Sequence, residues 1–445
     1  METERASRKR YLKMGLLTGV LGLSLWAMPA AWSAADHTYE HLKLLVDVLQ
    51  YIKENYVTEV DTQKLMYGAA SGMVKTLDPF SQFMEPEIHK EMKTETEGQF
   101  GGLGIRIQMR DNWLTVITPV PGTPAFRAGV LPGDRIIKIE TKTTQDISIG
   151  DALKKLRGEP GTKVSITVAR EEDGKWTTKD FTLTREVIRL ESVKYKMLRD
   201  KTGYLSIADF NAHTTDDMRK GLKDLKSQGM ETFVLDLRYN PGGLLSSAVD
   251  VSSFFLDDGK MVVYTQGRRS DSRQEFRAQG DGPYRDVPMT VLVNAGSASG
   301  SEIVAGSLQD QKRAVILGAR TFGKASVQSV IPLADGSGLR LTVAHYYTPS
   351  GKDIMRDEEG KTGGITPDIE IAVPRDVENK LQQQADEIFE PGKDARSTVK
   401  KEDQVKDEVL ERALELLKAR EVLGRLNTGV SAAVPKQDKS PVATP

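Results

Sequence analysis

A serine between a run of aliphatic residues and an amphipathic segment is the first candidate for chemistry. Residues 294–302 read NAGSASGSE, and the flanking patterns predict a strand before them and a helix after them. A hydroxyl at such a junction lies at the positive end of the helix dipole, where backbone N–H groups can hold a developing oxyanion. Ser299 is therefore the predicted nucleophile. Taken alone, the segment fits a helix-capping box better, because Glu302 stands at the position that completes one.

A lysine in the next loop could act as the base. Residues 321–328 read TFGKASVQ, so Lys324 follows a glycine. Serine can pass its proton to lysine only if the amine is neutral, and the ordinary lysine pKa is about 10.4. Apolar surroundings, which Phe322 and Val327 could provide, would lower that pKa. Taken alone, Lys324 fits a solvated loop lysine. Gln328 in an extended strand would share its face but lie roughly 13 Å away, so contact requires a bend.

A glycine pair after another aliphatic run is the third candidate. Residues 235–243 read LDLRYNPGG, which predicts a strand and a tight turn before a helix. The amides of Gly242 and Gly243 could approach a substrate closely because no side chain intrudes. They are candidate oxyanion donors together with the amide of Gly300. The alternative is an ordinary strand-to-helix turn.

A second glycine-rich loop lies earlier in the chain. Residues 101–105 read GGLGI, and Ile105, Ile107 and Met109 then alternate with polar residues, as in a strand. Consecutive amides in such a loop can bind a terminal carboxylate, while an edge strand pairs with the incoming peptide. The loop could equally be a plain turn. It does not fit a dinucleotide-binding fingerprint, because no helix follows it.

Helices and strands must hold these segments in place, and the sequence pattern predicts two folded regions that contain them. The glycine loop belongs to a compact module of short strands with two helices. The serine, the lysine and the glycine pair belong to a region where strands and helices alternate, which predicts a layered α/β domain. The predicted regions are a leader at 1–35, a helical region at 36–95, the strand-rich module at 96–185, the α/β region at 186–375, a helical region at 376–425 and a disordered tail at 426–445.

The N-terminus has the pattern of an export signal. Basic residues cluster within positions 5–13, and positions 14–35 carry no charge. Small residues at 33–35 favour cleavage before Asp36. The alternative is an uncleaved anchor, since the uncharged segment is long enough to cross a bilayer. Both interpretations place the body of the protein in the periplasm or otherwise outside the cytoplasm, with inner-membrane association if cleavage does not occur.

The composition excludes several functions. The chain of 445 residues has 62 Lys and Arg against 63 Asp and Glu, which gives no basic excess for a nucleic-acid partner. It has no cysteine, which excludes thiol catalysis, disulfides and thiolate metal sites. Its five histidines are scattered and form no HExxH motif.

Together these segments resemble the C-terminal processing peptidases, also called tail-specific proteases. The similarity runs from about residue 40 to 375. Residues 294–310 and 321–328 are similar to the two signature blocks of that family, in the same order and spacing. Other blocks are similar to its PDZ domain or to later parts of its protease domain, and they lie at 102–105, 128–134, 156–158, 348–351 and 364–368.

The resemblance implies a mixed α/β fold, with a ClpP/crotonase-like layered protease domain, an inserted PDZ domain and helical N- and C-terminal segments. The family's nucleophile corresponds to Ser299, its general base to Lys324, and the glutamine that assists the lysine to Gln328. Its remaining roles fall on the oxyanion donors Gly242, Gly243 and Gly300, on the carboxylate loop Leu103, Gly104 and Ile105, and on the candidate regulatory relay Arg157. A plain surface arginine is the alternative for that relay.

The implied activity is a serine endopeptidase that needs neither a metal nor an organic cofactor. The implied partners are protein substrates with exposed C-terminal tails, further copies of the chain bound through the terminal helices, and an adaptor protein. Gly300 stands where the family often has alanine, and Ala325 stands where glycine is common. Neither departure removes a reactive atom.

Two other classes of function compete with this interpretation. A PDZ scaffold or chaperone would bind tails without cutting them, but it would have no need for Ser299, Lys324 and Gln328 together. A Ser–His–Asp hydrolase could recruit His213 or His345. That second alternative lacks support, because no GxSxG motif surrounds the serine.

Overall fold

The computed structural model of the chain describes residues 28–431, apart from 173, 358, 375, 379, 382–383 and 385–404. Most of the predicted leader, at 1–27, and the end of the predicted tail, beyond 431, lie outside the described residues. The chain divides into two compact units, Met1–Phe83 and Met84–Pro445. Strand β1 (Gln82–Met84) spans the division.

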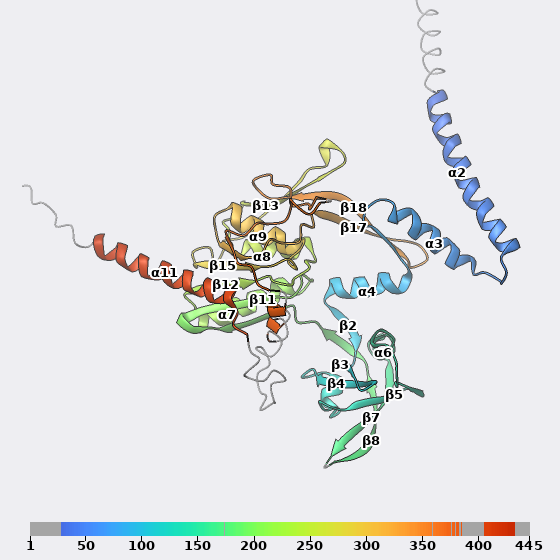
Figure 1. Cartoon of the computed structure of the whole chain (residues 1–445), viewed down its shortest axis with the longest axis horizontal. Coiled ribbons are helices and arrows are strands. Elements are labelled where there is room, and N and C mark those ends of the chain that lie inside the picture. The colour runs from blue at the N-terminus through green and yellow to red at the C-terminus, as the bar shows by residue number, and fades with distance from the viewer. Residues whose placement is uncertain are drawn as a thin grey trace, which may run out of the picture. The chain divides into compact units, whose positions relative to one another are not determined.

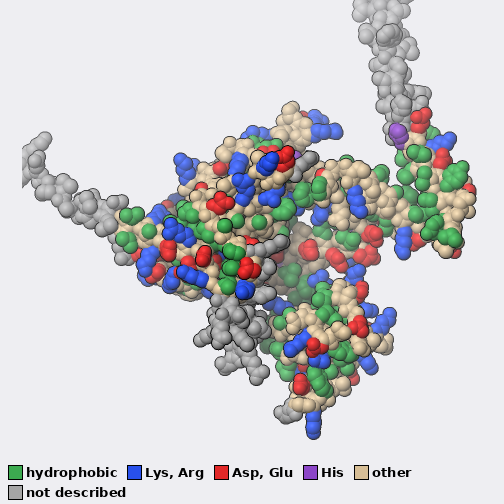
Figure 2. Space-filling model, viewed as in Figure 1, with side chains coloured by type: hydrophobic (Ala, Val, Ile, Leu, Met, Phe, Trp, Pro, Cys, Tyr) green, Lys and Arg blue, Asp and Glu red, His purple; other side chains and the backbone are tan. Residues whose placement is uncertain are grey.

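The first unit is helical. Helix α2 (Met28–Asn55) and helix α3 (Thr62–Lys75) lie largely within the predicted helical region, and α3 begins where the Asp61 carboxylate accepts two backbone N–H groups. Several apolar side chains of α2 are exposed, among them Leu42, Leu44, Val46 and Val48. Figure 2 shows apolar side chains along the visible face of this helix. Among the helices in the described part of the chain, none combines the length and the apolar character that a membrane crossing requires.

The strand-rich module in the second unit is an antiparallel sheet with short helices. Its strand order is β3-β4-β5-β7-β8, so β3 is an edge strand. The alternation of apolar and polar residues places Leu114, Ile136 and Val168 in a separate core. Its elements are β3 (Ile105–Arg110), β4 (Trp113–Pro119), α5 (Pro124–Arg127), β5 (Arg135–Ile139), β6 (Lys142–Thr143), α6 (Ile149–Leu156), β7 (Lys163–Glu172) and β8 (Lys175–Thr184).

The α/β region is built on a second sheet, of order β10-β11-β12-β15-β16-β19. Strands β11 to β19 pair in parallel, and β10 pairs with β11 antiparallel. Its elements are β10 (Val193–Met197), β11 (Thr202–Ile207), α7 (Thr214–Ser227), β12 (Thr232–Asp236), α8 (Leu245–Ser253), β15 (Met289–Val293), α9 (Gly300–Asp310), β16 (Val315–Gly318), β19 (Ile369–Glu370) and α11 (Glu408–Ser431).

Both faces of this sheet are covered by helices (Figure 1). Leu235 and Val291 face a core that also holds buried residues of α7, α8 and α9. Val234 and Leu292 point to the other face, where α11 packs through Ala413 and Leu417. Strands buried on both faces explain why their sequences are almost entirely apolar. The mixed, layered α/β fold expected from the sequence is confirmed.

A third sheet was not predicted from the sequence. It contains β13 (Met261–Gly267), β14 (Gln274–Arg277), β17 (Ser326–Pro332) and β18 (Gly338–Tyr347). A short ladder of β2 (Gln99–Gly102) with β9 (Glu186–Arg189) follows α4 (Pro86–Glu97). Two single helical turns complete the second unit, η1 (Arg199–Lys201) and η2 (Ser270–Ser272). Helix α11 continues to Ser431, past the predicted start of the tail at 426, and no proline occurs between the start of this helix at Glu408 and Pro435.

Candidate active site

Three neighbouring parallel strands deliver the candidate groups to one edge of the sheet. Strand β12 leads into the glycine turn at 237–244, β15 leads into the serine loop at 294–299, and β16 leads into the lysine loop at 319–325. These strands lie side by side in the order β12-β15-β16. Since the carboxyl ends of parallel strands meet at one edge of a sheet, this topology brings together segments that are far apart in sequence.

A buried carboxylate joins the serine loop to the lysine loop. Oε2 of Glu302 accepts the backbone N–H of Ser299 at 2.8 Å and that of Lys324 at 2.8 Å. Its Oε1 accepts the N–H of Gly323 at 2.7 Å and the hydroxyl of Thr321 at 2.6 Å. Glu302 has no exposed surface, and this burial raises its pKa, while its four hydrogen bonds act in the opposite direction. Glu302 therefore does more than cap α9, since it fixes the spacing of the two loops.

Ser299 has a strained backbone. Its φ is 51° and its ψ is −109°, a combination that L-residues rarely adopt. Such strain costs about 1–3 kcal/mol and concentrates at active sites. The residue immediately precedes α9, whose first residue is Gly300. Ser299 is the N-cap of α9 and forms the expected capping box with Glu302. A cap does not require such a conformation, so capping leaves the strain at Ser299 unexplained.

Lys324 lies in surroundings that favour its neutral form. Its pKa is lowered from the ordinary 10.5, chiefly by burial and further by the positive charge of Arg340, while Glu302 acts in the opposite direction. The apolar surroundings differ from those expected. Ala325 is fully buried and Val327 packs on the main core, but Phe322 is 42% exposed.

Gln328 lies in β17, as an extended strand would place it. The register between β17 and β18 shifts between Val327 and Gln328, which marks an irregularity of the kind a β-bulge produces. Gln328 pairs with Thr342, and Arg340 lies two residues away on the same strand as Thr342. A contact between Gln328 and Lys324 would require the bend that this register shift can provide. The assistance of Gln328 to the lysine remains a prediction.

The glycine turn abuts the serine. A Cβ added to Gly242 would lie 2.7 Å from Cβ of Ser299 and 2.8 Å from N of Gly300, and the residue has a φ of +100°. The amide of Gly242 already donates to Oδ1 of Asn240 at 2.8 Å. The peptide of Phe210 bonds this turn on both sides, because its N–H donates to O of Gly242 and its carbonyl accepts from N of Leu244.

We expect Gly242→Ala to lower kcat by about a hundredfold, in line with the loss of one oxyanion donor. The new methyl group would push the turn away from Ser299 and Gly300. Gly229→Ala is the matched control, because Gly229 also has a positive φ, of +89°, but nothing lies within 4 Å of an added Cβ. Steady-state cleavage by both variants checks this prediction. Equal losses in the two would show that backbone strain, and not the collision, causes the effect.

Tyr346 is a site residue that the sequence did not reveal. It is 5% exposed, and the side chain of Ser299 lies close enough to its hydroxyl to act on the pKa of Tyr346, in the direction opposite to burial. Its backbone N–H donates to O of Ala325 at 2.7 Å. The only sequence signal was the strand pattern of 338–347, which does not say what the strand faces.

The register of β18 bears on the histidine alternative. His345 pairs with Ser326 and Gln266, whereas the adjacent Tyr346 pairs with Thr265. Successive side chains of a strand point to opposite faces. The ring of His345 therefore points away from the face on which Tyr346 reaches Ser299.

The carboxylate loop leads into the edge strand of the strand-rich module. Leu103 is buried in the core of that module, at 3% exposure. Gly104 has a φ of +71°, and a Cβ there would lie 2.3 Å from Cβ of Thr123. Ile105 begins β3, whose apolar side chains pack on the same core. The structure thus places this loop at the start of an edge strand, where a peptide could add by strand pairing.

Arg157 ends α6 in the same module. Its guanidinium lies 4.4 Å from the ring centroid of Phe100, in β2. That strand pairs with β9, which leads into the α/β region. The position fits the predicted relay, which remains a prediction.

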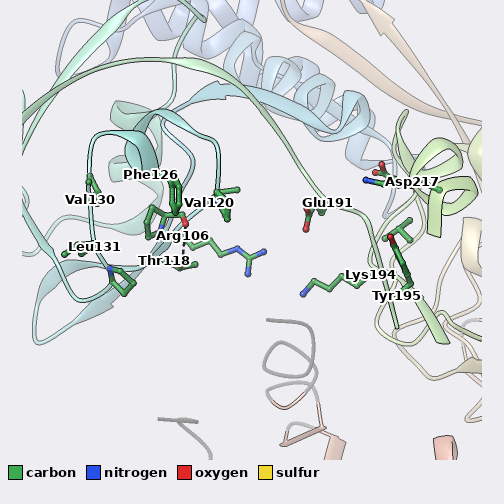
Figure 3. Close-up of a pocket in the computed structure, with 16 residues that line it drawn as sticks. Arg106, Thr118, Val120, Phe126, Val130, Leu131, Glu191, Lys194, Tyr195 and Asp217 are labelled. Carbon is green, nitrogen blue, oxygen red and sulfur yellow. Dashed lines mark hydrogen bonds between the residues drawn. The ribbon is translucent and has the colours of Figure 1, made fainter. Parts of the chain in front are cut away.

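A separate cleft does not contain the candidate catalytic groups. It has a volume of about 930 Å³ and is shown in Figure 3. Arg106 and Phe126 line it from the strand-rich module, and Lys194 and Tyr195 line it from β10. We therefore locate the chemistry at the sheet edge around Ser299.

Acidic and basic side chains are interspersed over the visible face of the molecule (Figure 2).

Comparison with known proteins identifies the class. Residues 201–371 match peptidase family S41, residues 115–170 match the PDZ domain, and residues 23–88 match the activating protease CtpB N-terminal domain. The carboxy-terminal-processing protease of Bartonella bacilliformis is 42% identical over 76% of this chain and 77% of its own length. The carboxyl-terminal-processing protease of a Synechocystis species is 35% identical over 77% and 78%. The solved photosystem II D1 C-terminal processing protease is 30% identical, with 74% and 92% coverage and a TM-score of 0.42.

These similarities define a serine-type endopeptidase with a PDZ domain. The chain belongs to peptidase family S41. The family resemblance expected from the sequence is confirmed, and the competing view of a tail-binding scaffold without peptidase activity is not supported.

Proposed function

We propose that this protein is exported, captures the C-terminal tail of a protein substrate on its PDZ domain, and cleaves that substrate with a Ser299–Lys324 dyad. The observation that carries the proposal is the Glu302 carboxylate, whose single oxygen Oε2 holds the backbone of both dyad members. A carboxylate buried between two loops is costly unless its bonds are all made. Its presence therefore indicates that the relative position of the two loops matters.

The proposed mechanism is acyl transfer. Neutral Lys324 removes the proton from Oγ of Ser299, and Oγ forms a bond to the scissile carbonyl carbon. Lysinium then gives a proton to the leaving amine as the C–N bond breaks. Water, deprotonated by the same lysine, adds to the acyl-enzyme carbonyl, and Oγ departs with the returned proton. Gln328 is assigned to orienting the lysine.

The geometry of the glycine turn reduces the number of candidate oxyanion donors from three to two. The amide of Gly242 is already bonded to Asn240, so we assign the donors to Gly243 and Gly300. Gly242 then serves by allowing close approach, since any side chain there would collide with the serine loop. The amide of Gly300 is the first of α9, and helix amides at this end have no partner within the helix.

Tail capture is assigned to the loop of Leu103, Gly104 and Ile105. Two features support this assignment: the loop belongs to a PDZ domain, and it leads into the edge strand β3. Backbone pairing along β3 would give affinity, and pockets for alternate side chains would give preference among tails. The names of the relatives, which describe processing at the carboxyl terminus, agree with this substrate class.

We expect an unstructured protein with an apolar, free C-terminus to be cut at least about tenfold faster than the same protein with an amidated C-terminus, because amidation removes the charge that the loop amides bind. Gly104→Ala should weaken tail-peptide binding, since the new Cβ would collide with Thr123. Gly129→Ala is the control, because Gly129 also has a positive φ but open space around it. Equal cleavage of both substrates would refute tail capture. Tail binding by a wild type that never cleaves would refute the peptidase.

Three further parts of the proposal concern the surroundings of the enzyme. Export is supported by the basic, then uncharged N-terminal sequence. Homo-oligomerisation through the terminal helices is supported by the exposed apolar side chains of α2. An adaptor protein is included because the cleavage of folded partners requires a way to deliver an unfolded segment to the buried serine. No cofactor is required by the mechanism.

A further inference from the structure

The phenol of Tyr346 lies beside the candidate nucleophile but outside the proposed dyad. The side chain of Ser299 is close enough to its hydroxyl to lower the pKa of Tyr346, in opposition to burial. Its backbone N–H donates to O of Ala325, the residue next to Lys324. One residue therefore has its side chain near the nucleophile and its backbone bonded to the lysine loop.

The surrounding strands hold this phenol in place. Tyr346 pairs with Thr265 of β13, and the preceding residue, His345, pairs with Ser326 of β17, so β18 is bonded on both edges here. The ring belongs to the main core, which also contains Ala325 and, at its margin, Val327. A side chain packed in this way keeps one rotamer, so its hydroxyl stays in place near Ser299 before any substrate arrives.

The phenol keeps its proton at the pH values at which a peptidase works. Burial raises the pKa of Tyr346 to about 12. A neutral phenol of this kind is a poor base, but it has an O–H group to donate. Its useful role toward Ser299 is therefore that of a hydrogen-bond donor.

We propose that Tyr346 is a further catalytic residue, whose O–H donates to Oγ of Ser299 and stabilises the negative charge that develops there. This inference rests on the proposed Ser–Lys mechanism. In acylation the Oγ–H bond breaks, an N–H bond forms on Lys324, and an Oγ–C bond forms to the carbonyl carbon. In deacylation the Oγ–C bond breaks, and the same donor supports the departing Oγ until lysinium returns the proton. The O–H bond of Tyr346 stays intact throughout.

The test compares Tyr346→Phe with wild type in two assays. One measures kcat and KM on the unstructured substrate, and the other measures the rate at which a fluorophosphonate probe labels Ser299. We expect kcat and the labelling rate each to fall about ten- to a hundredfold, with KM unchanged, because only a bond to developing charge is lost. The acidic limb of the pH profile should stay in place, because Lys324 is unaltered.

Tyr347→Phe is the matched control. Tyr347 is the next residue on β18, and its ring stacks on Tyr264 with centroids 5.1 Å apart. Adjacent strand residues face opposite ways, so the hydroxyl of Tyr347 points away from Ser299. We expect this variant to label and cleave at the wild-type rate. A loss of equal size in both variants would mean that packing of the strand, and not the donor, explains the effect.

A second measurement keeps the proposal testable if Tyr346→Phe is unstable. A difluorotyrosine placed at position 346 keeps the O–H but makes it more acidic. The proposal predicts that activity is retained near neutral pH and lost on the alkaline side at a lower pH than in wild type. An unchanged alkaline limb, or wild-type or faster labelling by Tyr346→Phe, overturns the role of Tyr346 and leaves the dyad standing. A wild type that neither labels at Ser299 nor cleaves overturns both.

Discussion

Ser299→Ala is expected to abolish peptide-bond cleavage, with a loss of at least about 10⁴-fold, as removal of a nucleophile typically causes. The fold should survive, because the backbone N–H that donates to Glu302 is retained and only one oxygen atom is removed. Cleavage should be followed with an unstructured substrate, and folding by thermal unfolding.

The same variant separates the peptidase from a binding scaffold. Tail-peptide affinity should equal that of wild type, because the proposed capture loop at Leu103–Ile105 belongs to a different sheet from the serine. His213→Ala should retain activity, since the dyad needs no imidazole. Normal cleavage by Ser299→Ala, or loss of cleavage in His213→Ala, would require another nucleophile or base.

Lys324→Met is expected to lower kcat by about 10²- to 10⁴-fold, the usual range for loss of a positioned general base. Methionine has a similar shape and no charge, so it suits this half-buried position without the desolvation of an ammonium group. Lys352→Met is the matched control, because Lys352 is an exposed lysine of the same unit. If Lys324→Met cleaved like wild type, lysine would not be the base.

The dependence of kcat/KM on pH gives a second test of Lys324 as the general base. Burial and Arg340 lower the pKa of Lys324 below 10.5, so the neutral amine is populated at a lower pH than in a solvated lysine. Only the neutral form can accept the proton. We therefore expect kcat/KM to rise with pH through an apparent pKa below 10.5, and to fall as acid protonates the amine. The residual activity of Lys324→Met should lack this limb.

The local sequence determined the elements that carry the candidate groups. Aliphatic runs predicted β12 and β15, the strands before the glycine pair and before Ser299, and the amphipathic segment after Ser299 predicted α9. Signals of this kind are local, because each depends only on which face of an element is buried. Ser299 and Lys324 were found in the same way, since both occupy short loops beside such elements.

Local sequence patterns could not predict contacts between segments that are far apart in the chain. The local pattern predicted only a capping role for Glu302, but in the fold its carboxylate is also bonded to a loop some twenty residues away. Tyr346 does not belong to a recognisable motif. Buried and exposed residues alternate only weakly in β17 and β18, the hairpin that positions it. Phe322 was expected to shield the lysine and is instead 42% exposed.

There is a physical reason why the sequence determined some features of the site and the tertiary structure determined others. Residue type and spacing along the chain decided which groups could react, because hydroxyl, amine and glycine amide chemistry is intrinsic to those residues. Sheet order decided which groups meet: β12, β15 and β16 lie side by side, and only that arrangement brings the Gly242 turn, Ser299 and Lys324 to one edge. Burial, which lowers the pKa of Lys324 and raises that of Tyr346, is likewise a property of the tertiary structure alone.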